Sequence, residues 1–86
     1  MKNWKEHLSG PDGNALKPRT LVEVYGKTRV LVEQHRGIFG YGTDCIRIGT
    51  TYGILVVEGD DLRLCCMSRT QVVIRGQLLG LRLEEN

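Results

Sequence analysis

Apolar and polar residues alternate with a period of two along most of the chain after residue 20. Alternation of this kind is typical of strands that bury one face. Short pairs containing glycine or aspartate separate the alternating segments, and such pairs favour tight turns. The pattern predicts seven to eight short strands, which the turn signals place at residues 21–25, 28–34, 38–41, 45–49, 53–58, 61–67, 71–75 and 78–83.

Strands of this length, separated by turns, are typical of all-β folds. We therefore expect a small antiparallel sandwich or roll. A short β-solenoid-like stack is the alternative, because the motifs Val22-x-Val24-x-Gly26 and Val72-x-Ile74-x-Gly76 echo one another. Residues 54–57 and 72–74 are apolar at every position. We expect these two segments to be central strands, or to lie in a self-association surface.

The first 18 residues differ from the rest, because turn-forming residues crowd the stretch from Ser9 to Asn14. Pro18 disfavours a helix that would run into the first strand. We expect residues 1–18 to form a flexible tail and residues 19–86 to form one β domain. Trp4 is the only tryptophan and lies in the tail. It is a candidate anchor for a partner, and the alternative is that it folds back over the sheet.

The 86 residues include twelve basic and ten acidic side chains, a net charge of +2. This charge is too small to indicate a dedicated nucleic-acid binder. Three cysteines, two of them adjacent, favour a reducing cytoplasm over a disulfide framework. No stretch approaches the ~20 apolar residues that span a bilayer, and the first residues lack the apolar core of a signal peptide. We expect a cytoplasmic protein that reaches a membrane only through a partner.

Few residues offer catalytic or metal-binding chemistry. Cys65 and Cys66 are adjacent on a predicted strand, so they point to opposite faces and cannot chelate one ion. We expect Cys66 to pack among the leucines of that strand, Leu62 and Leu64. His35 lacks a nucleophile at any recognisable spacing, and an enzyme would have to join it to a carboxylate such as Asp44. We predict no catalytic residue, no metal site and no cofactor.

Four arginines alternate with aliphatic residues on the predicted strands, at positions 47, 63, 75 and 82. If the aliphatic side chains face the core, the arginines face outward and neighbouring strands align them into a basic stripe, partly offset by glutamates. Such a stripe is either a solvated face that protects strand edges or a docking surface for an acidic partner or an anionic membrane. The His35-Arg36-Gly37 corner is a second candidate contact. The candidate partner-binding residues are His35, Arg36, Arg47, Arg63, Arg75, Arg82 and Trp4.

A family resemblance rests on the run Val32-Glu33-Gln34-His35-Arg36-Gly37-Ile38, on Tyr41, and on spaced aliphatic residues and glycines from Ile46 to Leu64 and from Ile74 to Leu81. Through these residues the chain from Pro18 to about Leu83 resembles the YabP/YqfC family of sporulation proteins, and within it the YqfC branch. The resemblance implies a small protein of endospore-forming bacteria, made in the mother cell and needed for proper spore development. It implies no enzymatic activity. It also implies a companion membrane protein, YqfD.

These observations favour a non-enzymatic sporulation protein that acts as a small adaptor or assembly module in endospore morphogenesis. The expected partner is a YqfD-like membrane protein, and a homo-oligomer stays open. The alternative is a small β-barrel nucleic-acid-binding protein. Such proteins stack bases on aromatic side chains of a basic sheet face, whereas the aromatic residues here cluster near predicted turns, at Tyr25, Phe39, Tyr41 and Tyr52.

Overall fold

The computed structural model describes residues 19–85, so the predicted tail of residues 1–18, with Trp4, lies outside the described part. The described part is all-β, as predicted. Its strands are β1 (Leu21–Tyr25), β2 (Arg29–Glu33), β3 (Ile38–Tyr41), β4 (Cys45–Thr50), β5 (Gly53–Met67) and β6 (Gln71–Glu84). All neighbouring strands pair antiparallel, in the order β1-β2-β6-β5-β4-β3. This pairing excludes the solenoid-like alternative, whose stacked strands run parallel.

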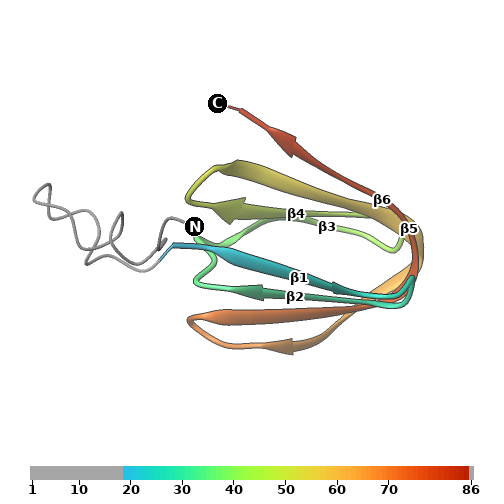
Figure 1. The fold of residues 1–86 in the computed structure, drawn as a ribbon. Helices are drawn as coiled ribbons and strands as arrows, with labels where there is room; N and C mark the ends of the chain where they lie inside the picture. The colour runs from blue at the N-terminus through green and yellow to red at the C-terminus, as the bar shows by residue number, and fades with distance from the viewer. Residues whose placement is uncertain (1–18, 86) are drawn as a thin grey trace, which may run out of the picture.

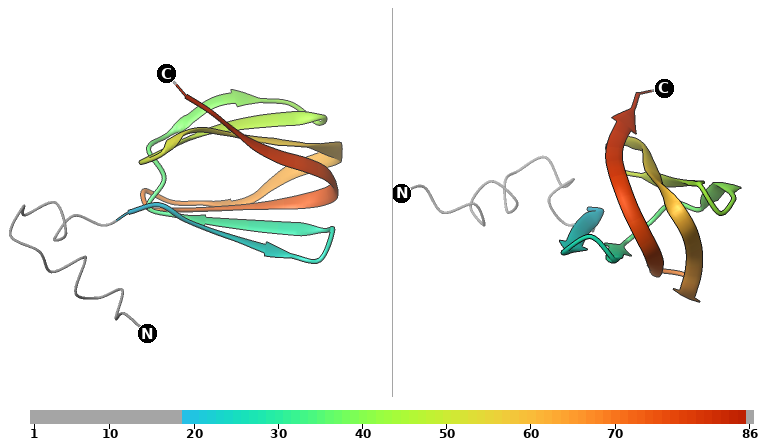
Figure 2. Two further views of the ribbon diagram at one scale, coloured as in Figure 1. Left: turned by 45° about the horizontal axis from the view of Figure 1, so that its top comes forward. Right: turned by 90° about the vertical axis from the view of Figure 1, so that its right-hand side faces the viewer.

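The single sheet bends over itself because β5 and β6 are long, with 15 and 14 residues, and both curve near their middle (Figure 1). The first half of β5 and the second half of β6 join β4 and β3 in what we call the β4 layer. The second half of β5 and the first half of β6 join β2 and β1 in the β2 layer. Figure 2 shows the two layers from other sides. The result is the sandwich-like roll expected from the pattern.

The strand count differs from the prediction, because Gly59-Asp60 and Gly76-Gln77 do not form turns. Each pair lies inside a continuous strand, and the two pairs face each other across the β5–β6 ladder, with Asp60 opposite Gln77. Register shifts on either side of this point supply the bend, as β-bulges do in curved sheets. Four predicted strands therefore merge into two, which leaves six strands.

Gly59 allows the two long strands to lie close together at the bend. A Cβ atom added there would lie 2.2 Å from the carbonyl oxygen of Gln77. Gly76 is similar, because a Cβ would lie 2.7 Å from the carbonyl oxygen of Asp61, and its φ of +147° is rare for other residues. The bend therefore depends on glycine in both strands.

The core lies between the layers and takes aliphatic side chains from both. The fully buried members of this cluster are Val30, Val32, Ile46, Ile48, Val57, Leu62, Val72 and Ile74. The segments that are apolar at every position are central strands, since residues 54–57 lie between β4 and β6, and residues 72–74 lie between β2 and β5. Val56 faces away from the core yet is fully buried. Its ladder neighbours are Arg47 and Arg82, whose aliphatic stems can cover apolar surface.

Thr20 ties the layers together at the end opposite the bend. Its backbone N–H donates to Thr51 Oγ1 at 3.1 Å, and the Thr51 N–H donates back to Thr20 Oγ1 at 3.0 Å. The Thr20 hydroxyl donates to the carbonyl of Gln34 at 2.7 Å. These bonds connect the start of β1 to the β4–β5 turn and to the end of β2, so they close this end of the core.

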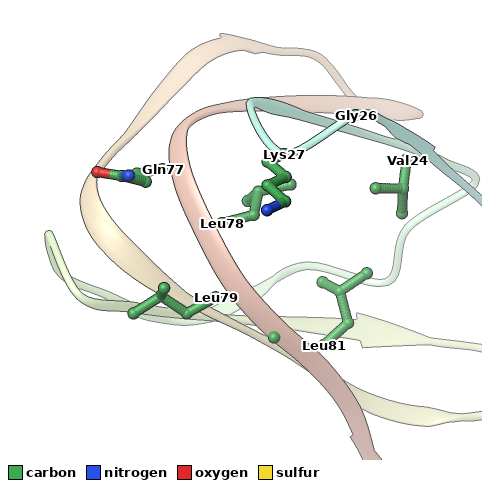
Figure 3. A pocket seen from close by; sticks show the side chains of 8 residues that line it. Val24, Gly26, Lys27, Gln77, Leu78, Leu79 and Leu81 are labelled. Carbon is green, nitrogen blue, oxygen red and sulfur yellow. The ribbon is translucent and has the colours of Figure 1, made fainter.

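One long side of the roll is open between β1 and the second half of β6. A groove of about 470 Å³ lies there, lined by Val24 of β1, by the following turn, and by residues 77–81 of β6. Figure 3 shows Leu81 pointing toward the β1 side of this groove. Three inward-facing apolar side chains beside it are partly exposed, Val24 at 47%, Leu81 at 37% and Leu83 at 54%. The core is therefore incompletely covered on this side.

Candidate partner-binding surfaces

The four arginines of the predicted stripe all lie on outer faces, but they form two groups. Arg47 and Arg82 belong to the β4 layer, and Arg63 and Arg75 belong to the β2 layer. Because the two layers face each other across the core, their outer faces point in opposite directions. The bend therefore divides the expected stripe into two separate surfaces, which differ in charge.

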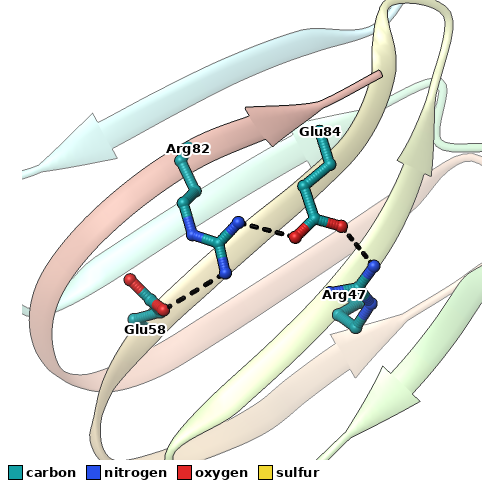
Figure 4. Close-up of polar contacts among 4 residues, drawn as sticks. All are labelled: Arg47, Glu58, Arg82 and Glu84. Atoms are coloured by element: carbon teal, nitrogen blue, oxygen red, sulfur yellow. Dashed lines mark hydrogen bonds and ion pairs between the residues drawn. The ribbon is translucent and has the colours of Figure 1, made fainter. Parts of the chain in front are cut away.

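On the β4 layer the arginines are neutralised by glutamates (Figure 4). Arg82 pairs with Glu84 at 2.6 Å, between Nη1 and Oε2, and with Glu58 at 3.5 Å, between Nη2 and Oε2. Arg47 pairs with the other carboxylate oxygen of Glu84. Two positive and two negative side chains give this network no net charge. We call this set, Arg47, Glu58, Arg82 and Glu84, the ion-pair network.

The ion pairs shift the pKa of their members. The hydrogen bonds from Arg47 and then Arg82 lower the pKa of the Glu84 carboxyl below its ordinary value of 4.5. The same carboxylate raises the pKa of both guanidinium groups. All the side chains involved are between 32% and 50% exposed, so solvent screens the pairs. The network links β4 to β6 across β5, which lies between them, and it offers little free charge to a partner.

On the β2 layer three arginines stand in a row across three adjacent strands. Arg75 of β6 is directly opposite Arg29 of β2 on one side and Arg63 of β5 on the other. Like charges placed directly opposite repel each other. The guanidinium of Arg29 lies over the ring of Tyr25, 4.4 Å from its centroid. We call Arg29, Arg63 and Arg75 the arginine row.

The arginine row keeps most of its positive charge. Among residues 19–85, the ion pair found for the row joins Arg63 to Asp61 at 3.3 Å, and both side chains are more than 70% exposed. A pair this exposed contributes little. The sequence pattern did not identify Arg29 as a candidate partner-binding residue. Its place in the row follows from the register between β2 and β6, which the local pattern does not reveal.

The His35 corner has a structural role. The Gly37 N–H donates to His35 Nδ1 at 3.0 Å, so the ring proton is on Nε2, which lies 2.8 Å from the carbonyl of Ser68. Both ring nitrogens are therefore bonded to main chain, and the ring links the β2–β3 corner to the β5–β6 turn. Next to it, the Arg36 N–H donates to the carbonyl of Gly49 at 2.7 Å, while the Arg36 side chain is exposed.

The expectation that Cys66 packs with Leu62 and Leu64 is wrong. A register shift between Leu64 and Cys66 adds an extra residue, Cys65, to β5. Cys66 is thereby opposite Val73, and both cysteines are exposed. A bulge reverses the alternation beyond it, which the residue pattern alone does not reveal. In the described range 19–85, no three His, Cys, Asp or Glu side chains gather as metal ligands would.

Comparison with protein-family models, with curated proteins and with solved structures finds no match for this chain. None of the residues 19–85 belongs to a helix long and apolar enough to cross a membrane. The arginine row and the open groove are two surfaces of the described structure with features that a partner could use.

Proposed function

We propose that this chain is a non-enzymatic adaptor or assembly module of endospore formation, acting in the mother-cell cytoplasm, that docks an acidic segment of a protein partner on its arginine row. The resemblance of residues 18–83 to the YabP/YqfC family supports the sporulation role and a YqfD-like membrane protein as the partner. The main support for this docking surface is that Arg29, Arg75 and Arg63 lie directly opposite one another on three neighbouring strands.

Because the three arginines lie directly opposite one another, their side chains repel each other in the free protein. Strands in a sheet are about 4.8 Å apart, so the row spans about 10 Å. Two or three carboxylates on an extended partner segment fit that span and accept charge-assisted hydrogen bonds from guanidinium groups. Binding an acidic segment would therefore relieve the repulsion as well as add contacts.

The experiment is quantitative co-purification of the full chain from sporulating cells, comparing the wild type with the double variant Arg63→Ala/Arg75→Ala. We expect the variant to bind the recovered partner about tenfold more weakly, which corresponds to about 1.4 kcal/mol. Arg19→Ala/Arg69→Ala is the matched control, because both of these arginines are exposed outside the row and the net charge changes equally. Equal recovery by all three proteins would show that the row is not the docking surface, and recovery of no partner at all would contradict the adaptor role.

A nucleic-acid-binding function is the second candidate, and one observation favours it. The exposed ring of Tyr25 lies under Arg29 at one end of the arginine row. An aromatic ring beside aligned positive charges is an arrangement that binds single strands. In a titration with a single-stranded oligonucleotide, binding that weakens steeply with salt and is lost in the Arg63→Ala/Arg75→Ala variant would favour this function over the adaptor.

A further inference from the structure

The second half of β6 has an unpaired edge. β2 pairs with β6 only from Gln71 to Arg75, and the last bond on that side joins the Leu78 N–H to the carbonyl of Lys27 at 2.7 Å. Within residues 19–85, the strand from Gly80 to Glu84 pairs with β5 alone. Its other edge borders the groove beside β1 (Figure 3). A row of free backbone donors and acceptors next to exposed leucines is a template for another strand.

This edge is the least protected of the four in the described structure. The second half of β5 carries charged residues and two register shifts. β3 has four residues and an irregular register, and β1 carries Glu23, for which no ion pair is found among residues 19–85. The β6 segment from Gly80 to Glu84 is regularly paired with β5, and its charged side chains, Arg82 and Glu84, neutralise each other. Bulges and unpaired charge are two of the usual edge protections, and this segment of five residues lacks both.

We propose that the second half of β6 pairs antiparallel with the same segment of a second copy of this chain, with Leu81 opposite Leu81 of the second copy. This interaction goes beyond the proposed function, because it uses a different surface from the arginine row. In this register the inward-facing leucines of both copies meet above the open groove. The exposed apolar surface beside Val24 is then covered.

The registers centred on Arg82 and on Leu83 also keep inward faces together, and both are less favourable. Centring the pair on Arg82 sets two guanidinium groups directly opposite each other, which is repulsive. Centring it on Leu83 sets Arg82 opposite Glu84 of the second copy, but it also sets the charged Glu85 opposite Leu81 on the inward face. The Leu81 register avoids both problems.

Charge complementarity supports the Leu81 register. It sets Arg82 of the second copy opposite Gly80, and Gly80 is the ladder partner of Glu58 on β5. Because Gly80 has no side chain, Arg82 of the second copy can extend over it toward Glu58. The two Cα atoms would lie about 10 Å apart, two strand spacings, which an arginine and a glutamate side chain span together. Each dimer would contain this contact twice.

The first test measures the molar mass of the full chain by light scattering over about a hundredfold range of concentration. We expect a weak dimer, because the paired segment is short. Leu81→Lys sets two positive charges opposite each other at the dyad and should shift the chain to monomer. Tyr41→Lys is the matched control, because Tyr41 belongs to the same inward row on the opposite edge strand and is also exposed. It should dimerise like the wild type.

The second test uses charge reversal between copies. Arg82→Glu and Glu58→Arg should each weaken the homodimer, because the cross contact becomes Glu–Glu in one protein and Arg–Arg in the other. A mixture of the two variants restores both cross contacts, so it should form a heterodimer more tightly than either variant forms a homodimer. Circular dichroism checks that each variant is folded. A difference in folding between the two variants would not by itself make the heterodimer tighter than both homodimers.

A chain that is monomeric at every concentration overturns the proposal. A dimer that survives Leu81→Lys, is lost with Tyr41→Lys, or shows no heterodimer preference overturns it too, because the interface then lies elsewhere. If the chain is monomeric and the fluorescence of Trp4 differs between the wild type and Leu81→Lys, the first 18 residues occupy the groove instead. If the chain is monomeric and the fluorescence of Trp4 is the same in both proteins, neither a second copy nor the first 18 residues cover the edge, and a different protein becomes the candidate occupant.

Discussion

Glu84 is the residue that connects two strands through charge. One of its carboxylate oxygens binds Arg47 of β4 and the other binds Arg82 of its own strand. The pKa of Glu84 in the folded protein is therefore lowered. A lowered carboxyl pKa means that the ionised form favours folding. That stabilisation is complete above the ordinary pKa of 4.5 and is lost as the pH falls through the lowered value.

Replacing Glu84 by glutamine should reveal this dependence. We expect Glu84→Gln to unfold at a lower denaturant concentration than the wild type at pH 7, with a difference that shrinks as the pH falls below about 4.5. Glu85→Gln is the control, since Glu85 follows Glu84 and is exposed. Urea titrations at a series of pH values measure the difference. A difference that stays constant down to low pH would mean that packing, not charge, gives Glu84 its effect.

Gly59 is a second residue with a measurable role. Alanine at this position would bring its Cβ 2.2 Å from the Gln77 carbonyl oxygen, and this oxygen belongs to the backbone of the opposite strand. The strands must separate locally, so we expect Gly59→Ala to lower the free energy of unfolding by about 2–3 kcal/mol. Gly42→Ala serves as the control, because its Cβ would make only ordinary contacts at 3.5 Å. Chemical denaturation compares the two, and equal stability would refute the steric role of Gly59.

The position of each strand could be predicted from the local residue pattern. That two predicted strands join into one long strand, in β5 and again in β6, could not be predicted. The alternation of Ile46, Arg47 and Ile48 settles which face of β4 is buried, and the structure agrees at all three positions. At Gly59-Asp60 the same residues suit either a turn or a bulge. The choice depends on whether the neighbouring strand bends with it, and that neighbour is distant in sequence. The arginine row and the open edge of β6 depend on the same topology, so neither could be predicted.

At the start of β1, the side chain of Thr20 closes one end of the core through hydrogen bonds. Thr20 is 5% exposed, and its hydroxyl accepts from Thr51 N–H and donates to the Gln34 carbonyl. Valine has the same shape but leaves both main-chain groups without their partner. We expect Thr20→Val to lower the free energy of unfolding by about 1–3 kcal/mol. Thr43→Val, at an exposed loop position, should change it little. Thermal unfolding of both variants tests this, and a neutral Thr20→Val would exclude the closing role.

At the scale of the whole molecule, the bend gives the two outer faces different characters. The β4 layer presents a balanced ion-pair network, and the β2 layer presents the arginine row, in which the ion pair found joins Arg63 to Asp61. Between them, on one long side, the core is open along β6. A protein with one charged face and one unpaired edge could bind a partner and a second copy at the same time, since the two surfaces do not overlap.

The double pairing of β6 also affects when the protein can fold during its synthesis. Of the described strands, β1 and β2 leave the ribosome first, but β2 has to wait for Gln71 to Arg75 before its second neighbour exists. β5 likewise lacks β6 along its whole length until then. A lone hairpin is marginally stable in water, and pairing between distant segments forms slowly. Because β6 completes both layers at once, we expect residues 19–85 to acquire their structure in one late step, after β6 has been made.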